Sequence, residues 1–165
     1  LEPSCLYTFR DELLAVLPGE EATRVSANTM LFEDFIVTEA RAGRFAPALA
    51  PIGEKALLHG HCHQKAFGAM GSVEAALRLI PGLKVETIAS TCCGMAGAFG
   101  YQAETIDVSL AMAELSLLPA IRKAEPETLL VADGTSCRHQ IRDGAGREAV
   151  HVVRMLARSM AAGAN

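Results

Sequence analysis

The 165-residue sequence has no tryptophan, few aromatic side chains and no strong excess of charge of either sign. Only 5% of the residues are aromatic, which argues against a surface on which nucleic-acid bases stack. The formal net charge is −4, and no basic stripe is present that would attract nucleic acid or an anionic membrane. Apolar runs stay shorter than a membrane span, and the first residues lack the basic and apolar segments of a signal peptide. We therefore expect neither a nucleic-acid partner nor a transmembrane segment.

Size and composition predict one domain. Half of the residues are hydrophobic, and 165 residues suffice for one compact core but not comfortably for two. The chain starts at Leu1 instead of a methionine, so we expect residues 1–165 to be a single domain cut from a longer polypeptide. Five cysteines, an odd number, without secretory features favour a reducing compartment, the cytoplasm, and thiols that serve as ligands or nucleophiles. Membrane association is then expected only through partner proteins.

Short apolar strands alternate with helices along the chain. Helical periodicity recurs in six stretches: 6–17, 29–42, 64–70, 73–80, 102–123 and 150–160. The longest of them is expected to bend near Pro119. Apolar runs bounded by turn residues predict strands at 55–59, 84–89 and 128–132. This order is typical of an α/β fold, in which a parallel sheet is flanked by helices.

Four of the five cysteines follow directly on these strands. Cys62 comes after the first strand, the pair Cys92-Cys93 after the second, and Cys137 after the third. Because the carboxyl ends of parallel strands meet at one edge of a sheet, the topology gathers the four thiols there, where ligands of α/β proteins usually bind. Helix N-termini at this edge would lower the thiol pKa values and favour an anionic cluster. The glycines after Cys93 allow the turn to lie close against a bulky inorganic group.

The cysteine pattern leaves other interpretations open. The run His61-Cys62-His63 offers imidazole and thiolate ligands that suit zinc or copper, although the paired spacings of most zinc sites are absent. A thiol nucleophile activated by His61, His63 or His139 is chemically conceivable but leaves the remaining cysteines without a role. Inert, buried thiols are a further alternative.

Other polar residues near the cysteines have two interpretations each. Arg138 and His139 follow Cys137 and are placed either to donate hydrogen bonds to cluster sulfurs or to form the solvated start of a helix. His59 and His151 are expected to be ordinary core or surface histidines.

One segment occurs twice in similar form. Residues 3–11 and 135–143 share Ser, Cys, Arg and Asp in register, so the same strand-to-helix turn is expected at both places. We interpret this as a duplication in which residues 1–17 are the end of a preceding half-domain. Cys5 then corresponds to Cys137 in a different site, and we expect it to play no part in the site formed by the four other cysteines.

Four thiolates are what a 4Fe-4S cluster requires, and the motifs around them resemble a known family. The three segments are Gly60-His61-Cys62-His63, Cys92-Cys93-Gly94-Met95-Ala96-Gly97 and Gly134-Thr135-Ser136-Cys137. Over about residues 55–145 they resemble the cysteine-rich CCG domain found in heterodisulfide reductase, in the iron-sulfur subunit of glycolate oxidase, and in the C-terminal iron-sulfur part of FAD-linked oxidases. The opening Glu2-Pro3-Ser4-Cys5, with Arg10-Asp11-Glu12, is most similar to the last group, whose members oxidise D-2-hydroxy acids such as lactate, glycolate or 2-hydroxyglutarate.

The resemblance implies an electron-transfer domain of a flavin-linked oxidoreductase. Such a domain takes electrons from FAD, held by another part of the polypeptide or by a partner protein, and passes them to a quinone, a cytochrome or another acceptor. The implied ligands of a 4Fe-4S cluster are Cys62, Cys92, Cys93 and Cys137. The implied surroundings of that cluster are His61, His63, Gly94, Arg138 and His139. The chain alone is expected to have no dehydrogenase activity.

One departure from the family pattern bears on the reaction. The heterodisulfide reductase pattern ends in Cys-x-x-Cys, and this sequence has Gly134 where the first of those cysteines would stand. The missing thiol argues against the noncubane cluster pair of that enzyme and against a thiol/disulfide redox role. The alternative from another class is a structural or interaction domain whose cysteines hold zinc or remain free.

Overall fold

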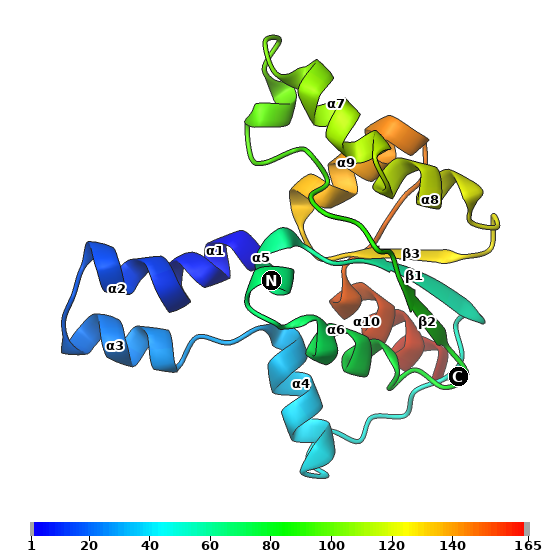
Figure 1. Cartoon of the computed structure of the whole chain (residues 1–165). Coiled ribbons are helices and arrows are strands. Elements are labelled where there is room, and N and C mark those ends of the chain that lie inside the picture. Colours follow the sequence, from blue (N-terminus) through cyan, green and yellow to red (C-terminus); the bar gives the residue numbers. More distant parts are fainter. Residues whose placement is uncertain (1, 164–165) are drawn as a thin grey trace.

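A computed structural model describes residues 2–163 and contains a three-stranded parallel sheet (Figure 1). Its strands are β1 (Lys55–His59), β2 (Lys84–Thr87) and β3 (Leu129–Ala132), and their order in the sheet is β2-β1-β3. The central strand β1 is buried over its last four residues. Its continuous apolar run is typical of a strand that is covered on both faces.

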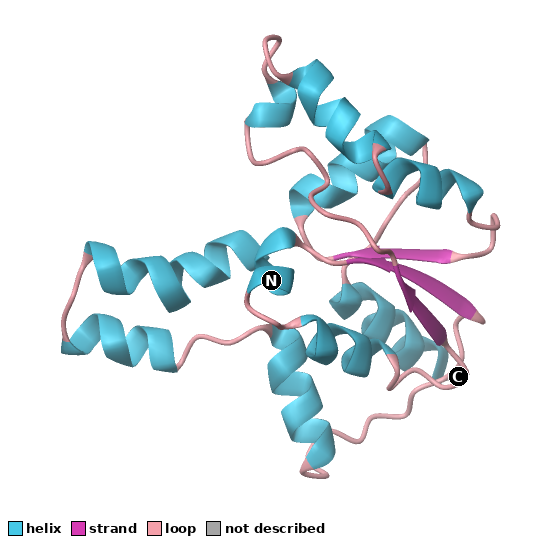
Figure 2. Cartoon of the chain, viewed as in Figure 1, coloured by secondary structure: helices cyan, strands magenta, loops and turns pink. Residues whose placement is uncertain are grey.

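Helices surround this sheet, and Figure 2 shows them on both of its faces. The α-helices are α1 (Pro3–Tyr7), α2 (Leu13–Val16), α3 (Glu20–Ala27), α4 (Phe32–Arg41), α5 (Cys62–Ala66), α6 (Met70–Leu77), α7 (Ile106–Glu114), α8 (Leu117–Lys123), α9 (Thr135–Ala145) and α10 (Val152–Gly163). A π-helical turn (Thr8–Glu12) joins α1 to α2, and a 3₁₀ turn (Phe99–Tyr101) precedes α7. In Figure 1, α1 to α3 form an arm that projects from the layered part of the molecule. No helix among residues 2–163 is long and apolar enough to cross a membrane.

Two apolar cores form, one on each face of the sheet. Leu58 and Val131 contribute to the core shared with α4, α6 and α10. Leu57 and Leu130 contribute to the other core, which includes side chains of α8 and α9. Alternate residues of a strand face the same side. His59 therefore lies on the same side as Leu57, toward α9.

The structure confirms the α/β fold with a parallel sheet, and β1 has the predicted ends. Two details of the helix prediction were wrong. The long helical stretch breaks at Leu115-Ser116 and not at Pro119, because Pro119 lies in the first turn of α8, where a missing N–H removes no intrahelical hydrogen bond. Helix α3 was not predicted, since most of its eight residues are polar and Ala22 is the only buried one.

Candidate metal centre

The carboxyl ends of the three strands bring Cys62, Cys92, Cys93 and Cys137 into one group. Cys62 begins α5 just after β1, the Cys92-Cys93 pair lies in the loop after β2, and Cys137 lies in the first turn of α9 after β3. Their thiols form a continuous row in which Cys62 contacts Cys92, Cys92 contacts Cys93, and Cys93 contacts Cys137. All four are free thiols. Strand order thus predicted the juxtaposition, whereas the role of these cysteines as metal ligands stays a prediction.

Hydrogen bonds within this row raise the pKa of two of the thiols and lower the pKa of the other two. The Cys62 thiol donates to Cys92, which raises the pKa of Cys62 and lowers the pKa of Cys92. The Cys93 thiol donates to Cys137, which raises the pKa of Cys93 and lowers the pKa of Cys137, and His59 lowers the latter further. The thiolate is the form that binds a metal. The row therefore has two groups that already favour the thiolate and two that would release protons when a metal binds.

A pocket of about 560 Å³ opens beside the row of cysteines. Its wall includes three of the four cysteines together with residues of α1, α5, the loop after β2 and α9: Glu2, Ser4, His61, Cys62, His63, Cys92, Cys93, Ala96, Gly97, Thr135 and Ser136. Cys62 is exposed, whereas Cys93 and Cys137 are buried. The row therefore runs from the solvent-facing pocket into the second core.

Gly94 shapes the turn that follows the double cysteine. Its φ of 87° lies in the left-handed region that favours glycine. A Cβ atom at this position would overlap the backbone carbonyl oxygen of Ser109 in α7. The Gly94 amide lies 3.3 Å from the sulfur of Cys92 and donates to it. Gly94 thus allows the close approach to α7 and supplies an N–H group to one of the sulfurs.

His61 and His63 lie beside the pocket, as the sequence suggested. The Nδ1 atom of His61 accepts a hydrogen bond from the His63 amide at 3.3 Å, and its Nε2 atom lies 3.3 Å from the hydroxyl of Ser4. Burial lowers the pKa of His61, which favours the neutral ring. The two rings and Cys62 offer ligand atoms within 4.8 Å of one another. The zinc or copper alternative therefore has a geometric basis.

Arg138 and His139 have partners other than the cysteine sulfurs. The guanidinium of Arg138 donates to the carbonyl oxygens of Ala132 at 3.0 Å and Asp133 at 2.5 Å, and so ties the end of β3 to α9. The Nδ1 atom of His139 forms a 2.6 Å hydrogen bond with the hydroxyl of Tyr101. These hydrogen bonds point to structural roles at the start of α9.

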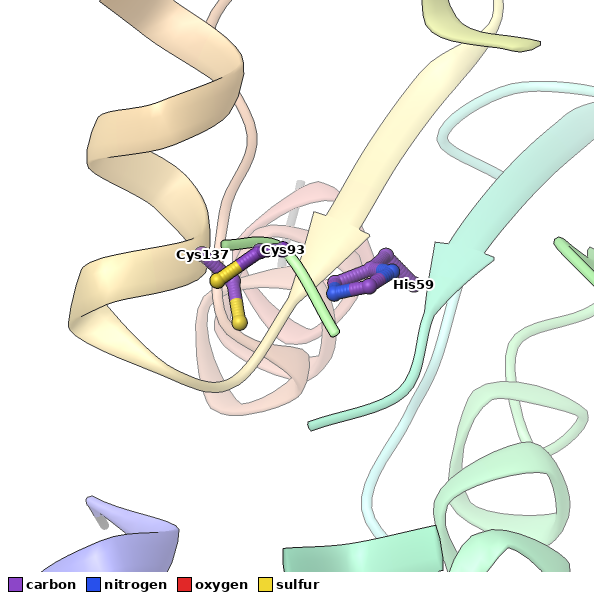
Figure 3. Close-up of side chains that lie close together, drawn as sticks. All are labelled: His59, Cys93 and Cys137. Atoms are coloured by element: carbon purple, nitrogen blue, oxygen red, sulfur yellow. The ribbon is translucent and has the colours of Figure 1, made fainter. Parts of the chain in front are cut away.

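His59 is a member of the site that sequence reasoning missed. It was expected to be an ordinary histidine, yet it is 1% exposed and offers a ring nitrogen within 4.8 Å of the sulfurs of Cys93 and Cys137 (Figure 3). The alternating directions of the side chains along β1 would have predicted this position. His59 must share the face of Leu57, which is the face that α9 covers.

The N-terminal arm also reaches the site. Glu2 and Ser4, which were assigned to a preceding half-domain, line the pocket, and a carboxylate oxygen of Glu2 accepts a hydrogen bond from the Thr135 amide at 2.8 Å. The two similar segments both start helices, so Cys5 and Cys137 are each the third residue of one. Cys5 is exposed and is absent from the pocket wall, in contrast to the buried Cys137.

Gly134 stands at the position where the family pattern would have another cysteine, and a histidine ring lies against it. A Cβ atom on Gly134 would overlap the ring of His61 and would lie 3.1 Å from the sulfur of Cys137. His61 therefore fills the space that a side chain at position 134 would need.

Comparisons with curated proteins find relatives among dehydrogenases. The chain is 32% identical to D-2-hydroxyglutarate dehydrogenase of Escherichia coli (strain K12) over 157 residues, which cover 94% of this chain and 15% of that protein. It is 28% identical over 160 residues to one of the subunits of anaerobic glycerol-3-phosphate dehydrogenase of the same strain, and this match covers 96% of this chain and 39% of the relative. The chain thus spans well under half the length of either relative. No protein-family model and no solved structure matches it.

Proposed function

We propose that this chain is an iron-sulfur electron-transfer domain of an oxidoreductase. In this proposal Cys62, Cys92, Cys93 and Cys137 hold one 4Fe-4S cluster. The observation that carries it is the row of four free thiols, drawn from the ends of three parallel strands and opening on a pocket. The relatives named as dehydrogenases support an oxidoreductase role.

The chemistry of the donor set fits such a cluster. Four thiolates are the ligands that a 4Fe-4S cluster takes, and the hydrogen bonds of the row already favour the thiolate at Cys92 and Cys137. When bound, the cluster would supply one-electron oxidation and reduction. The chain's own contribution is to hold the four ligands, to bury two of them, and to donate the Gly94 amide to the sulfur of Cys92. Such N–H groups and burial are the means by which proteins set cluster potentials.

Substrate and partners follow from the resemblance and from the relatives. We infer that the electrons come from FAD in another domain or a partner protein of the same enzyme and go on to a quinone, a cytochrome or another acceptor. The substrate class that we favour is a D-2-hydroxy acid such as lactate, glycolate or 2-hydroxyglutarate. This chain by itself is expected to oxidise no hydroxy acid, because in this proposal the flavin that reacts with the substrate belongs to another domain or protein.

Metal analysis of anaerobically purified protein tests the proposal. We expect brown protein with roughly four iron atoms and four sulfides per chain and broad absorption near 400 nm, which bleaches on reduction. A redox titration followed by electron paramagnetic resonance should then show a reversible one-electron step. Protein that stays colourless after anaerobic reconstitution overturns the cluster. A cluster that cannot be reduced reversibly overturns the relay.

Structural zinc is the second candidate, and a specific observation favours it. His59, Cys93 and Cys137 present nitrogen and sulfur atoms within 4.8 Å of one another, and zinc accepts this combination of ligands. About one zinc atom per chain, no iron after reconstitution, and a loss of folding stability on chelation would establish this alternative.

A further inference from the structure

His59 has a buried ring nitrogen whose hydrogen-bonding capacity is not used. The side chain lies at the end of β1 and is 1% exposed. Its Nδ1 atom lies 2.8 Å from the hydroxyl oxygen of Ser90. Its Nε2 atom makes no hydrogen bond of standard geometry with any atom of residues 2–163. Because a buried polar nitrogen without a partner destabilises the folded state, this position calls for a partner.

The cysteine site is what the ring of His59 faces. A ring nitrogen lies within 4.8 Å of the sulfurs of Cys93 and Cys137. Figure 3 shows the ring beside the two sulfurs, with one nitrogen at the end nearest to them. Since Nδ1 is engaged with Ser90, the nitrogen that faces the sulfurs is Nε2.

A chain of hydrogen bonds favours a proton on Nε2 of this ring. The ammonium of Lys65 can only donate, and it lies 2.5 Å from the carbonyl oxygen of Ser90, 2.9 Å from that of Thr91 and 3.3 Å from the hydroxyl of Ser90. The Ser90 hydroxyl oxygen can therefore accept from Lys65 while its own hydrogen is available for Nδ1 of His59. A neutral ring that accepts at Nδ1 carries its hydrogen on Nε2.

We propose that His59 donates its Nε2–H group to the sulfur of Cys137 and thereby raises the reduction potential of the metal centre. Lys65 and Ser90 hold the ring in the donating form, so His59 is a positioning and tuning residue and not a ligand. The physical reason is that a hydrogen bond to a thiolate stabilises the more negative, reduced state of a cluster. This inference rests on the proposed iron-sulfur function for its effect on potential, but the proton position that it assigns belongs to the metal-free chain as well.

The potential is tested with variants at His59. His59→Leu removes the donor, and His59→Gln places an amide N–H group near the position of Nε2. We expect all variants to keep the iron content of the wild type. At a fixed applied potential, the ratio of reduced to oxidised cluster should fall about tenfold in His59→Leu, which is about 59 mV for one electron. His59→Gln should recover most of this loss. Leu115→Gln, at a residue that is 77% exposed and lies outside the site, serves as the control and should have the wild-type ratio.

Two results would overturn the tuning role. One is a wild-type ratio in His59→Leu, and the other is a loss of iron from both His59 variants, which would make His59 a ligand.

Nitrogen-15 NMR of the metal-free wild type provides a readout that needs no cluster. The spectrum should show the Nε2–H form of His59, and Ser90→Ala should convert part of it to the Nδ1–H form. A wild-type ring protonated at Nδ1 refutes the inference even if the cluster is present, whereas absence of iron with an Nε2–H ring refutes only the proposed cluster.

Discussion

Glu33→Gln should stabilise the protein at neutral and alkaline pH, because Glu33 is a carboxyl group buried where its charge is unfavourable. Glu33 lies in α4, is 1% exposed, and its Oε1 atom has no hydrogen-bond partner within residues 2–163. The nearest polar atoms include the carboxylate of Asp133 and Nδ1 of His151, at 3.9 Å from Oε1. That Nδ1 also lies 3.0 Å from the Val153 amide, which donates to it, and 3.4 Å from Oδ1 of Asp133. Burial, followed by the charge of Asp133, raises the pKa of Glu33 to about 8.

The sign of the effect follows from proton binding. Between pH 4.5 and about 8 the unfolded chain has lost the Glu33 proton while the folded chain retains it, so the folded state binds more protons. Glu33 therefore lowers the free energy of unfolding progressively as pH rises through this window. Each pKa unit corresponds to about 1.36 kcal/mol, which sets an upper limit of roughly 3 kcal/mol for the change between about pH 5.5 and 8. Glutamine resembles the neutral acid in shape and does not ionise.

The assay is urea denaturation of the metal-free chain, kept reduced, at several values between about pH 5.5 and 8.5. The advantage of Glu33→Gln over the wild type should grow by about 1–3 kcal/mol across this range. Glu39→Gln, on the same helix, is the matched control. A hydrogen bond from Arg44 lowers the pKa of Glu39, so this group is ionised in both states above pH 5.5 and the difference from wild type should stay constant. A constant difference for Glu33→Gln as well would refute the reasoning.

Three further predictions concern the fold and the site. Gly94→Ala should lower the free energy of unfolding by about 2–4 kcal/mol, since it combines a left-handed backbone with overlap against α7; a urea midpoint equal to the wild type would contradict this. Cys5→Ser should leave the iron content and visible spectrum unchanged, while Cys93→Ser abolishes both. Equal iron loss from the two variants would show that Cys5 is also a ligand. Arg147→Met should lower the free energy of unfolding, measured by urea denaturation, by about 2–3 kcal/mol. The reason is that the Arg147 guanidinium donates to five backbone carbonyls of α8 and of the segment that joins α8 to β3. Unchanged stability would show that water replaces these hydrogen bonds.

The parts of the site that follow from chain order could be predicted, and those that depend on side-chain packing could not. Cys62, Cys92-Cys93 and Cys137 each follow a strand, and parallel strands end at one edge, so the topology alone brings them near each other. The pocket also contains Glu2, which is far from all of these cysteines in sequence and reaches them because α1 packs near the start of α9. No local sequence pattern at the N-terminus predicts that contact.

The same distinction explains the errors in the helices. Pro119 is a strong signal, but its effect depends on whether it falls in the first turn or the interior of a helix, and that is decided by the break at Ser116. Helix α3 escaped notice because it lies in the arm with a single buried residue, Ala22. A short and mostly polar helix has few apolar positions from which a helical period can be recognised.

At the pocket, the imidazole of His61 occupies the space where the family pattern would have a cysteine, and this difference bears on the reaction class. Where the heterodisulfide reductase pattern would have a cysteine, Gly134 leaves room for the ring of His61, and burial keeps that ring neutral. A cysteine ligand would bring a negative charge, whereas the neutral imidazole brings none and bonds instead to Ser4. Each negative charge removed from the surroundings of a cluster makes its reduction easier. If the site holds the proposed cluster, four thiols with a neutral His61 in place of a fifth thiolate would favour the acceptance of single electrons over the reduction of a disulfide.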